Sequence, residues 1–151
     1  MKAKIFFPLI AFGLIVAMAI YFLIHPSYEK SLEAKYYYEI GNYQKAYELA
    51  NEAFSMDLYN RMASTIMAQS KISMKYQKYV VQARKYLKEI NSIISKDVLS
   101  DADRAKIKMM SEIMVDSYVK LAPSVITDKA LVAEAQKYYK EFERILEKVT
   151  R

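Results

Sequence analysis

The chain carries IFFPLIAFGLIVAMAIYFLI at residues 5–24, an unbroken apolar run without a charged side chain. As an α-helix, with a rise of 1.5 Å per residue, this run is roughly 30 Å long, which is the thickness of the hydrocarbon core of a bilayer. Apolar side chains point to every side of such a helix, so it has no polar face to turn towards water. We therefore expect residues 1–25 to form an N-terminal transmembrane anchor and residues 26–151 to form a separate helical domain.

A removable signal peptide is the alternative interpretation of this run. Lys2 and Lys4 would form its positively charged start, and Ala17-Met18-Ala19 resembles a cleavage site. However, residues 20–24 follow that site and are strongly apolar, so cleavage would leave a hydrophobic N-terminus. The apolar region of a signal peptide is also shorter, about 7–15 residues. The sequence thus favours an uncleaved anchor.

Charges on either side of the run predict its orientation. Lys2 and Lys4 precede it, whereas the first basic residue after it, Lys30, lies between Glu29 and Glu33. The positive-inside rule then places the N-terminus in the cytoplasm. The expectation is a single-pass protein of the inner (cytoplasmic) membrane of a bacterial envelope, with its soluble domain periplasmic or otherwise extracytoplasmic. The chain has no cysteine, which is compatible with either compartment.

The composition of residues 26–151 predicts an all-α fold. Gly41 is the only glycine of this part, Pro26 and Pro123 are its only prolines, and no stretch alternates apolar and polar residues. Its apolar and polar residues recur at helical spacing between short polar breaks, one of which is residues 73–77. The expected helices are 27–41, 43–56, 60–73, 78–95, 102–121 and 128–149, which pair into three antiparallel hairpins.

Helix ends and packing faces can also be predicted. Pro26 suits a first turn, Ser100 or Asp101 would cap the helix that follows, and Thr127 or Asp128 would begin the last one. The last helix carries the apolar stripe Leu131, Ala135, Tyr138, Phe142, Ile145 and Val149, and the fourth carries Val80, Ala83, Leu87, Ile90 and Ile94. Such stripes indicate packing within the domain, with a coiled-coil partner as the alternative for the last helix.

One segment contains a recognisable pattern. Tyr37 is followed by Gly41-x-Tyr43-x-x-Ala46 and then by Ala50, Ala53, Phe54 and Asp57. This pattern, over about residues 27–60, resembles the tetratricopeptide repeat, whose 34-residue unit is a helical hairpin closed by small residues. The pattern departs from the family at Lys30, where an aromatic residue is usual, and at Leu58, where a proline is common. The other two expected hairpins match the repeat only weakly.

The resemblance implies a right-handed stack of hairpins with a concave groove that binds a partner protein or peptide. The first helices would line this groove and supply the partner-binding residues Tyr36, Tyr37, Arg61 and Lys71, together with Lys35, Ser64 and Gln69. Tyr37 has a second interpretation, because the repeat pattern places one tyrosine against the neighbouring helix. The expected function is a membrane-anchored scaffold or assembly factor with chaperone-like binding. The alternative is a structural accessory subunit of a larger envelope complex.

The sequence offers little for other functions. The net charge is +6, but acidic and basic residues are interspersed, and a domain outside the cytoplasm meets little nucleic acid, so we expect no nucleic-acid partner. The one long basic run, residues 71–88, suits anionic lipid headgroups or an acidic partner. There is no cysteine nucleophile, no glycine-rich phosphate loop and a single histidine, His25. We therefore expect no enzyme, no cofactor and no metal.

Overall fold

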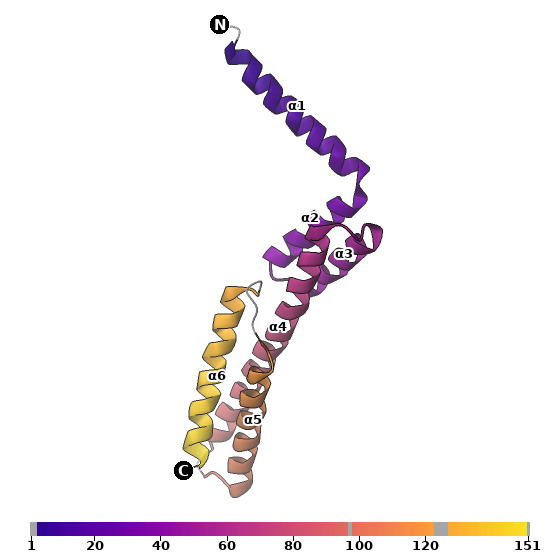
Figure 1. Ribbon diagram of the computed structural model, residues 1–151. Helices are drawn as coiled ribbons and strands as arrows, with labels where there is room; N and C mark the ends of the chain where they lie inside the picture. Colours follow the sequence, from indigo (N-terminus) through magenta and orange to yellow (C-terminus); the bar gives the residue numbers. More distant parts are fainter. Residues whose placement is uncertain (1–2, 97, 123–126, 151) are drawn as a thin grey trace. The chain divides into compact units, whose positions relative to one another are not determined.

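The computed structural model describes the backbone of residues 3–96, 98–122 and 127–150, and their side chains except at residues 3–6, 22 and 23. These residues form six α-helices and no strand, which confirms the all-α prediction (Figure 1). The helices are α1 Ala3–Ile24, α2 Pro26–Glu39, α3 Tyr43–Met56, α4 Arg61–Ile94, α5 Asp101–Val119 and α6 Lys129–Thr150. The chain divides into two compact units, Met1–Lys71 and Ile72–Arg151.

The break predicted at residues 73–77 does not exist, because α4 runs without interruption from Arg61 to Ile94. Hence the two helices 60–73 and 78–95 are one helix, and the second of the three expected hairpins is wrong. The polar side chains of this stretch do not interrupt the helix, since Ser73 and Tyr76 are buried while Lys75 and Gln77 are exposed. The segment contains no glycine or proline, and serine within a helix costs well under about 1 kcal/mol.

The turn between α2 and α3 follows from Gly41. Its φ of +79° lies in the left-handed region, which a residue without a side chain adopts at no steric cost. Gly41 N donates to Tyr38 O (3.0 Å) and Asn42 N donates to Tyr37 O (2.9 Å), the two bonds of a Schellman ending. Asn42 then caps α3, because its Oδ1 accepts from the N–H of Lys45 (3.2 Å). Two adjacent residues thus end one helix and begin the next.

Small residues bring the helices of the first unit together. Ala34, Ala46, Ala50 and Ile66 form its core with Leu49, and the three alanines are fully buried. Ala53 is also fully buried. Ala46, Ala50 and Ala53 are small residues of the sequence pattern, and their burial confirms that α2 and α3 form a hairpin.

A buried polar network joins the same three helices. Asn60 is fully buried, and its Nδ2 donates to Ser27 Oγ and to Ser31 Oγ (2.8 Å each) and to Ser27 O (3.2 Å). Ser27 Oγ donates in turn to the carbonyl of Ala53 near the end of α3 (2.8 Å). The Oδ1 of Asn60 accepts from Ala63 N (3.1 Å) and so caps α4. One amide side chain therefore fixes α2, α3 and the start of α4.

The second unit is a three-helix assembly of residues 72–94 of α4 with α5 and α6. Phe142 and Ala135 of α6 are fully buried with Ile90, Ile107 and Met114, and the rest of the α6 stripe packs against them. The stripe of the last helix is thus confirmed as packing within the chain. The α4 stripe is confirmed except at its end, where Ile93 is buried and Ile94 is exposed.

Charged and polar caps close this unit. Ser100 caps α5 in a capping box, since Ser100 Oγ accepts from Asp103 N (3.1 Å) and Asp103 Oδ2 accepts from Ser100 N (3.2 Å). Lys96 Nζ lies 2.6 Å from Asp103 Oδ1. The Oδ1 of Asp128 accepts from Ala130 N (2.8 Å). Of the alternatives left by the sequence, Ser100 and Asp128 are therefore the caps.

We expect Asn60→Ala to lower the free energy of unfolding of the full chain by about 2–4 kcal/mol. About 1 kcal/mol comes from the lost cap, and the rest comes from buried polar groups that lose their partner. Asn42→Ala is the matched control, because Asn42 caps α3 but is exposed, so its loss costs only about 1 kcal/mol. Urea unfolding in detergent, followed by circular dichroism, measures both. Equal losses for the two variants would contradict the role of the buried network.

Asp103 gives the stability of the second unit a dependence on acid. The ammonium of Lys96 and then the hydroxyl and N–H of Ser100 lower the pKa of Asp103 from 3.8 to about 2. The folded state therefore holds this proton less tightly than the unfolded state, so the stabilisation is complete above pH 4 and is lost as the pH falls towards 2. Above pH 4, Asp103→Asn should have a lower free energy of unfolding than the unmodified chain, and unfolding curves should show this difference shrinking as the pH falls towards 2. Asp101→Asn, in the same helical turn, should lower the free energy of unfolding less. If the free energies of unfolding of Asp103→Asn and the unmodified chain differed equally at all pH values, Asp103 would not be the source of the acid dependence.

Candidate binding surfaces

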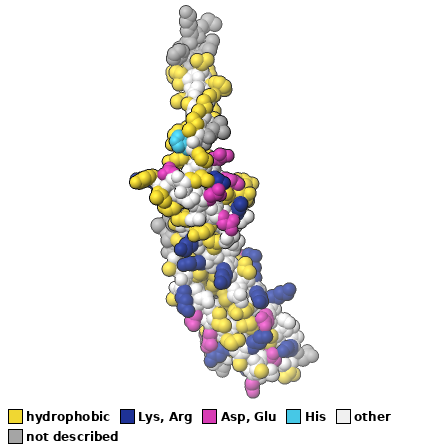
Figure 2. All heavy atoms as spheres, turned by 90° about the vertical axis from the view of Figure 1, so that its right-hand side faces the viewer, with side chains coloured by type: hydrophobic (Ala, Val, Ile, Leu, Met, Phe, Trp, Pro, Cys, Tyr) yellow, Lys and Arg dark blue, Asp and Glu magenta, His cyan; other side chains and the backbone are white. Residues whose placement is uncertain are grey.

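Between Phe7 and Tyr21 the surface of α1 is apolar on every side. The described side chains from Phe7 to Tyr21 are all exposed, among them Phe7 (77%) and Leu9 (68%). Figure 2 shows them in yellow along the upper part of the chain. Among residues with described side chains, no single helix is both long and apolar enough to cross a membrane, whereas Phe7–Tyr21 and Pro26–Glu39 together qualify by length and composition as a bent pair.

The first unit holds a cleft of about 390 Å³ between α2 and the first turns of α4. Tyr38, Met62 and Ile66 supply its apolar part, and Ile66 also belongs to the core of the unit. Polar side chains complete the lining, namely Lys35 and Glu39 from α2 and Arg61, Thr65 and Gln69 from α4. An apolar floor with a polar rim is the usual composition of a site that binds a peptide or small molecule.

Of the four residues predicted for partner binding, one lines this cleft and three lie outside it. Arg61 lines this cleft. Tyr36 is 61% exposed, and its ring meets that of Tyr37 edge to face at 5.5 Å. Tyr37 is half-buried against the core, as the second interpretation of the repeat pattern expects. Lys71 is exposed at the end of the unit and does not line the cleft.

The sequence named part of the lining and missed the rest. Lys35 and Gln69, which the repeat pattern assigned to the groove, line the cleft, while Ser64 lines a neighbouring hollow with Arg61. The lining residues that the sequence missed are Tyr38, Glu39, Met62, Thr65 and Ile66. Spacing alone could have suggested Tyr38 and Glu39, since they lie three and four residues after Lys35 on one helix face.

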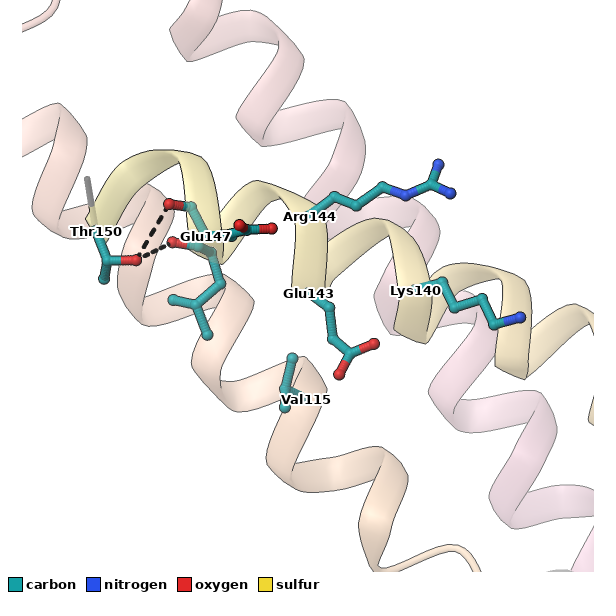
Figure 3. Close-up of a pocket in the computed structure, with 7 residues that line it drawn as sticks. Val115, Lys140, Glu143, Arg144, Glu147 and Thr150 are labelled. Carbon is teal, nitrogen blue, oxygen red and sulfur yellow. Dashed lines mark hydrogen bonds between the residues drawn. The ribbon is translucent and has the colours of Figure 1, made fainter.

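The second unit has a larger hollow along α6. Its volume is about 540 Å³, and its lining consists of Val115 of α5 with Lys140, Glu143, Arg144, Leu146, Glu147 and Thr150 of α6 (Figure 3). Glu143 and Arg144 leave α6 in different directions, and Thr150 Oγ1 donates back to Leu146 O (2.6 Å). Charges of both signs alternate here, which is typical of a solvated helix face.

A smaller cleft of about 190 Å³ lies between α4 and α5. It is lined by Lys75, Lys78, Tyr79 and Gln82 of α4 and by Met114, Ser117 and Leu121. Tyr79 is 4% exposed, and within the described residues its hydroxyl has no hydrogen-bond partner. Burial, followed by the nearby Tyr118 and Tyr139 hydroxyls, raises the pKa of Tyr79 above its ordinary value.

The described residues were also compared with the requirements of a metal site and of a catalytic histidine. In the part of the chain that the structure describes, no three His, Cys, Asp or Glu side chains gather as a metal would require. His25 Nδ1 lies 2.9 Å from Tyr21 O, and its ring stacks on that of Tyr21 at 4.2 Å. These contacts place the histidine at the junction of α1 and α2, outside the clefts.

Comparisons of the chain with protein-family models, with curated proteins and with solved structures gave no match. The resemblance to the tetratricopeptide repeat therefore rests on the residues of 27–60 alone.

Tyr79→Phe should raise the free energy of unfolding by about 1 kcal/mol, because a buried hydroxyl without a partner destabilises the folded state. The gain should grow above pH 10, the ordinary pKa of tyrosine, since the unfolded chain ionises there before the folded one does. Tyr139→Phe is the control at neutral pH, because the Tyr139 hydroxyl donates to Glu143 and its removal there brings no such gain. Unfolding curves at neutral and alkaline pH test this, and a less stable Tyr79→Phe variant would show that the hydroxyl is satisfied.

Proposed function

We propose that the protein is a membrane-anchored interaction module that binds a partner protein or peptide in the cleft between α2 and the first turns of α4. This proposal is carried by one observation, that the apolar helix α1 leads directly into the unit that holds the cleft. A helix that is apolar on all sides leads into a helical unit whose cleft has an apolar floor and a polar rim.

The anchor follows from α1. This helix of 22 residues is about 33 Å long, and insertion into lipid removes its exposed apolar side chains from water while its own backbone hydrogen bonds stay satisfied. Lys2 and Lys4 favour a cytoplasmic N-terminus, so the remainder of the chain lies on the extracytoplasmic side of the inner membrane.

The repeat resemblance supports the choice of cleft. In tetratricopeptide domains the first helices of successive hairpins line the groove, and the corresponding helices here are α2 and the beginning of α4. Because α4 continues unbroken to Ile94, the repeat-like hairpin is followed by one long helix and not by a second hairpin.

The lining selects a type of ligand. Met62 and Ile66 accept an apolar side chain, whereas the charges of Lys35 and Arg61 favour a carboxylate. Gln69 can both donate to and accept from a peptide backbone. An extended segment with an apolar residue beside an acidic one therefore fits best.

A structural accessory subunit is the second candidate, and one observation favours it. Leu32, Tyr36 and Ile40 are spaced by four residues along α2 and are 41%, 61% and 57% exposed. Such a stripe suits permanent packing against another helix of a complex, without any peptide ligand.

Site-specific photo-crosslinking in native membranes distinguishes the two functions. A crosslinking side chain at Thr65 in the cleft should capture one partner, and one at Asn51 on the exposed side of α3 should not. Arg61→Ala should weaken capture about 30-fold, which corresponds to about 2 kcal/mol for a central arginine contact. Capture from Tyr36 but not from Thr65 would favour the accessory subunit and exclude the cleft.

A further inference from the structure

We propose that the turn between α3 and α4 is a second membrane contact, in which Leu58 and Tyr59 enter the lipid headgroup layer beside the end of α1. This inference rests on the anchoring role of α1 in the proposed function. It adds a specific lipid-facing surface to the helical unit.

The two side chains of this turn are strongly exposed. Tyr59 is 92% exposed, against 77% for Phe7 in α1, and Leu58 is 68% exposed. Exposed single apolar residues are common, but a neighbouring tyrosine and leucine at the tip of a turn have the composition of an interfacial contact. A tyrosine ring offers both an apolar body and a hydroxyl for the polar headgroups.

The turn holds these side chains in place. Tyr59 N donates to Asp57 Oδ1 (2.9 Å), and Asn60 N donates to Asp57 O (3.1 Å). Asn60, which follows directly, is fully buried. Both ends of the turn are therefore fixed, so the exposed pair loses little conformational freedom when it meets lipid.

Hydrogen bonds from the Asn60 side chain place the turn at the end of the unit where α1 enters. Asn60 Nδ2 donates to Ser27 Oγ (2.8 Å) and to Ser27 O (3.2 Å), and Ser27 lies in the first turn of α2, two residues after His25. Figure 1 shows the α3–α4 turn close to the start of α2. A turn bonded to the residues that directly follow the anchor lies near the bilayer surface.

Aromatic side chains gather at this end. The ring of Tyr21 stacks on that of His25, with 4.2 Å between the ring centres. The ring of Tyr28 lies near both, with its centre 5.9 Å from that of Tyr21 and 6.3 Å from that of His25, which it meets edge to face. Such a group is the expected composition of the boundary between lipid and water. Leu58 and Tyr59 continue this boundary from the helix junction onto the α3–α4 turn, which favours lipid over a protein as their occupant.

Single tryptophans can test the contact, because the chain has none of its own. The full chain in liposomes would carry Tyr59→Trp, Phe12→Trp in the anchor, or the control Ile40→Trp at the far end of α2, which is also exposed. Lipids carry a quencher either on the headgroup or near the end of the acyl chain. We expect headgroup quenching of Tyr59→Trp to be about twice that of Ile40→Trp, since the interface reaches only the turn.

The variants separate failure of the inference from failure of the anchor. Phe12→Trp should be quenched most by the acyl-chain quencher, and quenching by neither lipid would overturn the proposed anchor. If Phe12→Trp is quenched but Tyr59→Trp behaves like Ile40→Trp, only the second contact is wrong. Leu58→Trp gives an independent measurement from the same turn, and circular dichroism checks that each variant folds.

Discussion

The side chain of Asn60 bonds directly to α2 and α4 and reaches α3 through Ser27, and the arrangement of the first unit depends on it. Its amide donates to Ser27 and Ser31 of α2, its carbonyl caps α4, and Ser27 passes the connection on to Ala53 of α3. A buried amide tolerates only positions that meet its hydrogen-bonding needs, whereas apolar contacts between alanines tolerate sliding. The network therefore sets the register in which Ala34 and Ala46 pack.

This constraint also determines what the unit can present to a ligand. The walls of the cleft come from α2 and α4, the helices that Asn60 joins, so the network holds the backbones of the two walls in one arrangement. A preorganised cleft spends less of the binding energy on ordering its own walls. The same network fixes Tyr59 beside the junction with α1, because the α3–α4 turn ends at Asn60.

The parts of the fold that the sequence predicted are those governed by local chemistry. Gly41 and Asn42 end one helix and start another through bonds to residues within five positions, and Ser100 caps α5 in the same local way. The false break at residues 73–77 has the opposite origin, since a polar stretch can be a turn or the outer face of a helix, and only the burial of Tyr76 decides between them. The bonds from Asn60 to Ser27 and Ser31 join residues far apart in the chain and leave no local signal.

The candidate site was predictable in part for the same reason. The repeat pattern named Lys35 and Arg61, which line the cleft, but it could not say which side of α2 faces α4. That side is chosen by Ser27 and Ser31, which turn towards Asn60 and leave Tyr36 on the exposed side. Tyr36 and Arg61 therefore lie on two different surfaces of the unit and do not line one groove. A ligand of the cleft and a subunit packed along Leu32, Tyr36 and Ile40 could occupy the same unit together, because they use different sides of α2.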